Sequence, residues 1–355
     1  MVRISNFMAM ACAIVGLALV LPTAALAQTI TEYMLPNASS QPRGITEGPD
    51  GALWFVEGAD RIGRITTGGA VTEFTIPTGG SGPYDITTGS DGALWFTETS
   101  GNQIGRVTTA GSFTEYALPV GTTPYSIVAG PDGALWFTGA GTNNIGRITT
   151  GGSITFYALP TAGSQPVWIT VGPDGALWFT QQAGNRIGRI TTGGAITEFT
   201  VPTPGSGVFD ITTGPDGALW FTEASTNAVG RVTTAGVFTE YALPTPGNAP
   251  LGIAPGPDGA LWFTQYIGNR IGRITTAGAI TEFALPNPGS QPGFIVRGPD
   301  NAMWFPEFAG DRIGRISAPV VATAVPTLSE WAMILFGLIL AAGAAIYIQR
   351  RQFIV

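Results

Sequence analysis

A six-residue string that recurs at nearly constant spacing constrains this chain more than any other feature. Asp-Gly-Ala-Leu-Trp-Phe occurs six times, and a varied seventh copy, Asp-Asn-Ala-Met-Trp-Phe, begins at Asp300. Successive copies are 41 or 42 residues apart, and an Ile/Val-Gly-Arg string also occurs seven times. A fixed period of this length is typical of repeat architectures, in which each repeat is one supersecondary unit. The regular copies begin at Asp50, Asp91, Asp132, Asp174, Asp216 and Asp258.

Each repeat contains four short runs of apolar or alternating residues. In the first repeat these runs cover 43–47, 52–57, 61–66 and 71–76. Gly-Pro-Asp-Gly separates the first two runs and suits a tight turn, because Pro fixes φ and Asp and Gly favour turns. Thr-Thr-Gly-Gly separates the last two and tolerates positive φ. No run has a helical period. Four antiparallel strands in 41 or 42 residues predict a β-propeller blade.

The two ends of the repeat region predict a closed ring. An open solenoid needs atypical capping repeats, whereas the seventh repeat differs mainly in that no fourth run follows Arg315. Residues 30–36 (Ile-Thr-Glu-Tyr-Met-Leu-Pro) match the fourth run 196–202 of another repeat. We therefore expect the N-terminal strand to complete the last blade, with Glu32 opposite Arg315, and to leave no open sheet edge. The predicted fold is an all-β, seven-bladed propeller of four-stranded blades.

Most repeated residues have a structural interpretation. The seven Trp-Phe pairs, of which the first begins at Trp54, are expected to fill the space between blades, because a binding site has no need of seven copies. The turn aspartates are expected to form turns rather than to bind metal. With a turn centred on Gly68-Gly69, Arg64 is expected to form a cross-strand ion pair with Glu73. The same offset joins Arg106 to Glu115, Arg189 to Glu198, Arg231 to Glu240 and Arg273 to Glu282, and places Arg147 opposite Phe156.

Composition excludes one class of partner. All 16 basic residues are arginine, the formal net charge is −7, and no basic patch occurs in the middle of the chain. Binding to nucleic acid needs a basic surface that neutralises phosphates. We therefore expect no nucleic-acid partner.

The N-terminus has the features of a secretory signal peptide. Arg3 precedes the apolar run 7–21, and Ala25-Leu26-Ala27 forms a small-residue cleavage site. A first transmembrane helix is the alternative, but the apolar run is short for one. The only cysteine, Cys12, lies inside this segment. The protein after residue 27 is therefore expected to have no disulfide and no cysteine metal site.

Residues 331–348 predict a second targeting signal. These 18 positions are predominantly apolar and uncharged, long enough to span a bilayer, and the Arg350-Arg351 pair that follows is expected in the cytoplasm. Val-Pro-Thr-Leu-Ser-Glu-Trp occupies 325–331 just before the span. Motif, helix and arginines in this order resemble the IPTL-type C-terminal sorting signal of Gram-negative bacteria, although Val replaces the usual Ile. The resemblance implies a sorting protease that processes the tail; a plain membrane anchor is the alternative. The expected layout is a signal peptide at 1–27, the propeller at 28–319, a linker with the sorting motif at 320–330, and a transmembrane helix with a basic tail at 331–355.

Function is expected where the near-identical repeats differ. Two positions in each repeat vary most in chemistry: one follows the proline before the first strand, and the other ends the second strand. Both are expected at the same mouth of the central channel, which would then carry carboxylates, one arginine and several aromatic residues. Apolar walls with a few polar groups are the usual composition of a ligand site; a solvated acidic rim without a ligand is the alternative. The candidate ligand-binding residues are Arg43, Glu57, Tyr84, Asp85, Glu98, Tyr125, Trp168, Asp210, Glu223 and Glu307.

The repeats, with Gly-Pro-Asp-Gly-Ala-Leu-Trp-Phe-Thr-Glu followed by Asn-Arg-Ile-Gly-Arg-Ile-Thr-Thr, resemble those of the streptogramin B (virginiamycin B) lyase family. The resemblance implies a propeller that linearises a cyclic depsipeptide by elimination, with histidine and glutamate near a Mg²⁺ ion at the channel mouth. A family histidine typically occupies a Pro-His-Gly-Ile string, to which Pro42-Arg43-Gly44-Ile45 is the nearest match here. The chain contains no histidine, so the family's base has no counterpart. Its glutamates suit Mg²⁺ as ligands, and one of them could act as a base if its pKa were raised.

Three functions are compatible with these observations. The favoured one is an exported, surface-associated propeller that binds a small-molecule, peptide or glycan ligand at the channel mouth, or serves in a surface matrix, without catalysis. The alternative is a Mg²⁺-dependent carbon–oxygen lyase with a carboxylate base, for which Glu223 and Glu307 are the candidates. The third is a structural envelope component. A propeller fold does not decide among them. The expected location is the periplasm, cell surface or extracellular space, with 331–348 in the membrane before processing.

Overall fold

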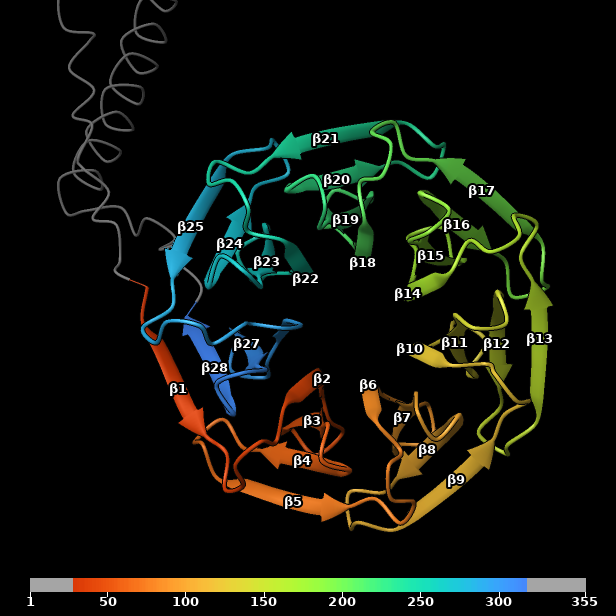
Figure 1. Cartoon of the computed structure of the whole chain (residues 1–355), viewed down its shortest axis with the longest axis vertical. Helices are drawn as coiled ribbons and strands as arrows, with labels where there is room; N and C mark the ends of the chain where they lie inside the picture. Colours follow the sequence, from red (N-terminus) through yellow and green to blue (C-terminus); the bar gives the residue numbers. More distant parts are fainter. Residues whose placement is uncertain (1–27, 318–355) are drawn as a thin grey trace, which may run out of the picture.

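The computed structural model describes residues 28–317, in which every regular element is a β-strand. The strands form seven four-stranded antiparallel sheets arranged around a central channel (Figure 1). The predicted all-β, seven-bladed propeller is therefore confirmed. No helix within the described residues is long and apolar enough to cross a membrane. The expected signal peptide (1–27) and membrane helix (331–348) lie outside the described residues.

Six blades take their four strands in sequence order, and the seventh combines the two ends of the described chain. Blades 1 to 3 contain β2 (Pro42–Glu47), β3 (Leu53–Glu57), β4 (Arg61–Ile65), β5 (Val71–Thr75), β6 (Pro83–Thr88), β7 (Leu94–Glu98), β8 (Gln103–Val107), β9 (Phe113–Ala117), β10 (Pro124–Ala129), β11 (Leu135–Gly139), β12 (Asn144–Ile148) and β13 (Ile154–Ala158). Blades 4 to 6 contain β14 (Pro166–Val171), β15 (Leu177–Gln181), β16 (Arg186–Ile190), β17 (Ile196–Thr200), β18 (Val208–Thr213), β19 (Leu219–Glu223), β20 (Ala228–Val232), β21 (Phe238–Ala242), β22 (Pro250–Pro255), β23 (Leu261–Gln265), β24 (Arg270–Ile274) and β25 (Ile280–Ala284). Blade 7 contains β26 (Val296–Arg297), β27 (Ala302–Glu307), β28 (Arg312–Ser317) and β1 (Ile30–Met34).

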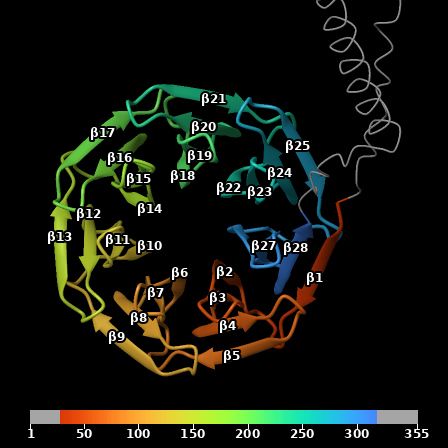
Figure 2. The same ribbon diagram turned by 180° about the vertical axis from the view of Figure 1, so that it is seen from behind.

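The first strand of each blade lies next to the channel, and the fourth lies at the rim of the ring. Both views show β6, β10, β14 and β18 innermost and β5, β9, β13 and β17 outermost (Figure 1, Figure 2). A residue at the start of a first strand therefore reaches the channel whichever blade carries it. The residues at these positions, which differ between repeats, are therefore neighbours in space.

The ring is closed by β1, as predicted. It pairs antiparallel with β28, and Leu35 N donates to Asp311 O (3.0 Å) just beyond the strand. The predicted partner of Glu32 is wrong, however, because Glu32 lies opposite Gly314 and Arg315 lies opposite Thr31. β1 gives the seventh blade the fourth strand that the other six blades have, so a single N-terminal strand joins the ends of the repeat array.

The predicted ion pair between Arg64 and Glu73 is also wrong, because the third hairpin has a different register. Gly63, not Arg64, lies opposite Glu73. The turn is a type I turn followed by a glycine in the left-handed region: Gly69 N donates to Thr66 O (2.8 Å), and Gly69 has a φ of 89°. This bulge adds one residue to one side of the hairpin and shifts the pairing by one. The other predicted pairs share the shift: Gly105, Gly188, Gly230 and Gly272 lie opposite Glu115, Glu198, Glu240 and Glu282, and Gly146 lies opposite Phe156.

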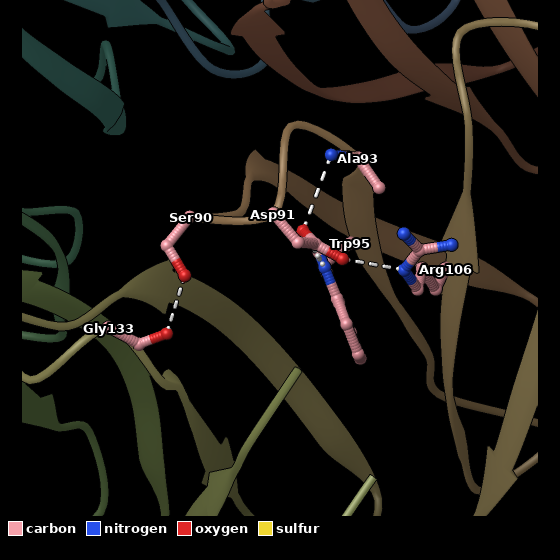
Figure 3. A network of polar contacts seen from close by, with 6 residues as sticks. All are labelled: Ser90, Asp91, Ala93, Trp95, Arg106 and Gly133. Atoms are coloured by element: carbon pink, nitrogen blue, oxygen red, sulfur yellow. Dashed lines mark hydrogen bonds and ion pairs between the residues drawn. The ribbon is translucent and has the colours of Figure 1, made fainter. Parts of the chain in front are cut away.

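The repeated arginine instead bonds to the turn aspartate of its own blade. In blade 2, Asp91 accepts hydrogen bonds from Trp95 Nε1 (3.0 Å) and Arg106 Nε (2.7 Å), and Ser90 Oγ donates to Gly133 O of the next blade (2.7 Å; Figure 3). Although partial burial opposes ionisation, the hydrogen bonds from Trp95 and Arg106 hold the pKa of Asp91 below its usual value. The same aspartate, tryptophan and arginine triad occurs in all seven blades. The aspartate is thus a structural turn residue, with a role wider than turn formation.

The core lies between neighbouring blades. Trp54 of blade 1 belongs to a buried cluster with Ile86 and Phe96 of blade 2, and the seven repeated tryptophans are inaccessible to solvent. Burial of a large aromatic side chain contributes on the order of 2–3 kcal/mol. The Trp-Phe pairs therefore fill the space between blades, as predicted.

Candidate functional site

A cavity of about 350 Å³ lies at the end of the channel where the first strands begin, which we call the channel mouth. Its lining comes from five blades and is mostly apolar, and Arg43 is the one charged residue among the described residues that line it. Cavities of this size with apolar walls and a single polar anchor are typical of small-ligand sites. The lining residues are Pro42, Arg43, Tyr84, Phe209, Leu251, Tyr266, Gly293, Phe294 and Phe308.

Aromatic rings from different blades meet across this mouth. Tyr84 lies 4.6 Å from Tyr125 between ring centroids, and Trp168 stacks on Phe294 at 4.2 Å with an interplanar angle of 21°. Phe209 lies 6.2 Å from both Trp168 and Phe294. The first strands of blades 1 to 6 begin here, and in blade 7 the segment that contains Phe294 precedes β26. Residues about 40 positions apart in sequence therefore become ring neighbours. Of these three candidate residues, Tyr84 lines the mouth, whereas Tyr125 and Trp168 contact the lining residues Tyr84 and Phe294.

Arg43 is held between two of these rings. Its guanidinium carbon lies 5.1 Å from the centroid of Tyr84 and 5.2 Å from the centroid of Phe308, within the range of cation–π interaction. Its Nε is buried and has no hydrogen-bond partner within residues 28–317. No carboxylate of the described residues forms an ion pair with Arg43. The stacked guanidinium therefore has donors free for an acceptor group of a ligand.

A second cavity of about 340 Å³ lies deeper in the channel and shares Phe294 with the mouth. Asp85 and Asp210 line this inner cavity and are almost fully buried. Asp85 accepts hydrogen bonds from Ser126 Oγ and Ile127 N of the next blade, both at 2.9 Å, and Asp210 accepts one from Ile253 N (2.8 Å). Both carboxylates thus connect neighbouring blades. Burial raises the pKa of Asp85 to about 7 and the pKa of Asp210 well above its usual value.

The four predicted glutamates do not line either cavity, which corrects the expected acidic mouth. Each is at most 1% exposed and lies inside its own blade at the end of the second strand. Glu57, for example, lies near Arg61 and Glu73 of its own blade, on the third and fourth strands. Side chains alternate along a strand, so the last residue of the second strand is buried in the blade, and in blades 6 and 7 it is the next residue that lines the mouth. The displaced residues are Glu57, Glu98, Glu223 and Glu307.

This alternation also explains two lining residues that the repeat comparison missed. Tyr266 and Phe308 directly follow Gln265 and Glu307, one position beyond the predicted variable site. Tyr266 donates a hydrogen bond to Gln291 Oε1 (2.9 Å) and lies 6.5 Å from Phe308 between centroids. Five blades carry small or polar residues at this position, namely Gly58, Thr99, Ala140, Gln182 and Ala224. Comparison of the repeats one residue further along would therefore have found both aromatics.

The residues of the mouth do not fit a divalent metal ion. No group of three or more carboxylate, histidine or cysteine side chains within residues 28–317 lies close enough to hold one. The glutamates sit in separate blades, and the oxygens of Asp85 and Asp210 already accept hydrogen bonds from backbone amides. Mg²⁺ needs near-octahedral oxygen coordination, which these positions do not supply together.

The fold and the cavity together define a closed, seven-bladed repeat propeller with an aromatic-lined cavity at one end of its channel. The chain belongs to the virginiamycin B lyase family, whose model matches residues 21–213 and 200–333. The IPTL-CTERM motif matches residues 323–352, so the C-terminus carries this type of sorting signal. The family and the sorting signal inferred from the sequence are thus confirmed, and the motif indicates an exported, surface-anchored protein.

Solved structures of lyases share this fold. Selenomethionine-substituted virginiamycin B lyase from Staphylococcus aureus is 42% identical, with a TM-score of 0.79, and the match covers 82% of this chain and 99% of that one. A streptogramin B lyase is 40% identical at the same TM-score, with 82% of this chain and 97% of that chain covered. A catalytically inactive His-to-Ala variant of the S. aureus lyase with quinupristin is 42% identical, with a TM-score of 0.79 and coverage of 82% and 99%.

Proposed function

We propose that this protein is an exported, surface-associated propeller that binds a ligand at the channel mouth without cleaving it. One observation carries the proposal: Arg43, stacked between Tyr84 and Phe308, is the only charged group among the described residues that line the mouth. Its guanidinium suits a carboxylate or carbonyl oxygen, and the surrounding rings suit an apolar or aromatic body. The expected ligand is a small molecule or peptide that combines both.

The absence of histidine favours binding without catalysis. Elimination needs a base whose pKa is matched to the working pH and which lies within hydrogen-bond reach of the substrate. The chain has no histidine, and the side chains at the mouth with ionisable protons are Arg43, Tyr84 and Tyr266. Burial raises the pKa of both tyrosines, so neither is a base at neutral pH. The inactive S. aureus variant, which lacks one histidine, was solved with quinupristin. A propeller of this type therefore holds a ligand without turnover.

The alternative is a lyase that uses a carboxylate as its base. Burial, together with the carboxylate of Glu240, raises the pKa of Glu223 to about 7, which suits a base. Against this, Glu223 and Glu307 are buried inside their blades and line neither cavity. Geometry thus favours the binding function over the lyase.

Binding and turnover are measured with one probe, quinupristin. Titration calorimetry on the full-length protein is expected to show binding, and Arg43→Ala is expected to weaken it at least tenfold, because a lost charge-assisted hydrogen bond costs about 1.5–3 kcal/mol. Arg186→Ala is the matched control, since Arg186 donates to Thr200 on the fourth strand of its own blade and lines neither cavity. Chromatography of the same mixtures with Mg²⁺ is expected to show intact quinupristin.

Two outcomes would contradict the binding proposal. Turnover that is abolished by Glu223→Gln or Glu307→Gln would promote the carboxylate lyase. The absence of both binding and turnover would exclude the mouth as a depsipeptide site and would favour a structural envelope component.

The proposed location follows from the two ends of the chain. We expect the signal peptide 1–27 to be removed and the tail to be processed by a sorting protease that reads the motif at 325–331. Residues 331–348 then anchor the protein in the membrane only before processing. Intact-mass spectrometry of protein from the native cell is expected to show a chain that ends before Val355. An unprocessed C-terminus would leave only the membrane-anchor function of the tail.

A further inference from the structure

A glutamate on the fourth strand ties each of six blades to the loop of its neighbour. In blade 2, both carboxylate oxygens of Glu115 accept hydrogen bonds from Thr78, which lies in the loop that leaves blade 1: N at 3.2 Å and Oγ1 at 2.9 Å. Both oxygens of this side chain thus act as hydrogen-bond acceptors. The same tie joins Glu198 to Thr161, Glu240 to Thr203, Glu282 to Thr245, Glu73 to Asn37 and Glu32 to Asn287.

In blades 4 and 6 the last residue of the second strand donates to this carboxylate. Gln181 Nε2 donates to Glu198 Oε1 at 2.9 Å, and Gln265 Nε2 donates to Glu282 Oε1 at 2.7 Å. The glutamine amide thus satisfies the side of the carboxylate that faces the blade. These two blades show what the site requires, which is a buried hydrogen-bond donor.

Four other blades carry glutamate where these blades carry glutamine. We call them the buried acids: Glu57, Glu98, Glu223 and Glu307. None is more than 1% exposed, and both side-chain oxygens of Glu57, Glu98 and Glu307 have no hydrogen-bond partner within the described residues. If ionised, such a group would be a buried charge beside a second carboxylate, which is costly. A neutral carboxylic acid has an O–H donor in place of the amide N–H of glutamine.

Blade 3 shows that the three positions depend on one another. Phe156 replaces the fourth-strand glutamate, Gly139 replaces the buried acid, and Val120 replaces the threonine of the loop. Donor, acceptor and acid are therefore absent together in the one blade that fills this space with a phenyl ring. The blade that has no fourth-strand carboxylate therefore has no buried acid either.

We propose that the four buried acids are protonated in the folded propeller at neutral pH and donate to the fourth-strand carboxylates, so that the ties between blades weaken as the pH rises. The buried acids are separate from the channel mouth, and this proposal does not depend on the ligand-binding proposal. At these positions a protonated glutamate can donate the same hydrogen bond that glutamine donates in blades 4 and 6.

The charges that face the buried acids support this assignment. Burial and the carboxylate of Glu115 raise the pKa of Glu98 to about 8, with Asp60 of the preceding blade acting in the same direction. Burial and Glu240 raise the pKa of Glu223 to about 7 against a hydrogen bond from Thr226.

The other two acids also face an arginine. Burial and Glu73 raise the pKa of Glu57 to about 7, with Arg61 opposing the shift and Asp311 adding to it. Burial raises the pKa of Glu307 against Arg312, whose Nη1 lies 3.9 Å from it, while Glu32 adds to the rise. Glu98 and Glu223 are therefore the better pair to test, because no arginine opposes the rise of their pKa values.

The direction of the pH effect follows from proton linkage. Below the unfolded-state pKa of about 4.3 each acid is protonated in both states. Above it the unfolded chain loses the proton while the folded chain keeps it, so stability falls with rising pH until the folded-state pKa, about 7 to 8, is passed. Each acid is expected to raise the unfolding equilibrium constant by up to about tenfold for each pH unit in this window.

The test compares denaturant unfolding of the full-length protein at pH 5 to 9, followed by tryptophan fluorescence. Glu98→Gln/Glu223→Gln is expected to fold, because it copies blades 4 and 6, and to lower the pH slope of stability by about two protons. Gln181→Glu is expected to add about one proton to the slope. Glu47→Gln, at an exposed position, is the matched control and is expected to leave the slope unchanged. Infrared spectra at pH 7 are expected to show protonated-carboxyl absorption that weakens in the double variant.

Two results would overturn the proposal. One is a double variant with the same pH slope and the same carboxyl absorption as the parent. The other is stabilisation by CaCl₂ or MgCl₂ at pH 8 that disappears in the double variant, which would assign the acids to a cation rather than to a proton.

Discussion

Deletion of residues 28–36 from the full-length chain is expected to cause aggregation or a large loss of thermal stability. This segment contains β1, which pairs with β28 along its whole length, and Tyr33 stacks on Trp304 at 5.5 Å. Leu35 is buried. Loss of these two side chains and the strand's hydrogen bonds removes more than about 5 kcal/mol, which is comparable with the whole stability of a typical domain. Thermal unfolding and light scattering measure the effect.

The matched control for this deletion is Met34→Ala. Met34 belongs to the same strand but is 69% exposed, so its substitution leaves the closure intact and is expected to change the melting temperature little. A truncated protein that melts like the parent would show that the ring does not need its N-terminal strand. A stable but polymeric truncated protein would instead indicate that the exposed edge of β28 pairs with other chains.

The closure could be predicted from the sequence because it depends on a match between whole strands. Residues 30–36 read like a fourth strand, and only one blade lacked one. The register of the third hairpin could not be predicted in the same way. It depends on one glycine, Gly69, whose left-handed conformation adds a residue to the turn and moves Glu73 from Arg64 to Gly63. Residue types at a Thr-Thr-Gly-Gly turn allow both registers, and the bulge decides between them.

The sequence indicated the position of the first-strand candidates in the fold but not that of the second-strand glutamates. Arg43, Tyr84, Tyr125 and Trp168 meet because every first strand borders the channel. The glutamates lie at the end of a strand, where a difference of one residue changes the side on which a side chain lies. Composition alone gave no sign of burial, since a glutamate at a variable position is usually solvated. These glutamate carboxylates belong to the buried interior of their blades and not to the channel mouth.

Gly105→Ala is expected to destabilise the propeller by about 3 kcal/mol, at the upper end of the cost of overpacking a core. Gly105 lies opposite Phe96, and a Cβ at this position would overlap the Phe96 ring, which is fully buried between strands. The ring belongs to the buried cluster that contains Trp54 and Ile86, which restricts its movement. The same contact occurs in all seven blades, which explains why the glycine of every Ile/Val-Gly-Arg string is invariant along this chain. Denaturant unfolding measures the loss.

A second glycine provides the control for this substitution. At the turn, a Cβ on Gly68 would meet nothing nearer than Thr66 Oγ1 at 3.8 Å, and the corresponding residue of blade 2 is already Ala110. Gly68→Ala is therefore expected to change the free energy of unfolding by less than about 0.5 kcal/mol. Adding Phe96→Leu to Gly105→Ala removes part of the ring and is expected to recover stability, as a steric conflict requires. If Gly105→Ala were as harmless as Gly68→Ala, the invariant glycines would have to be explained by something other than the packing of phenylalanine against the strand.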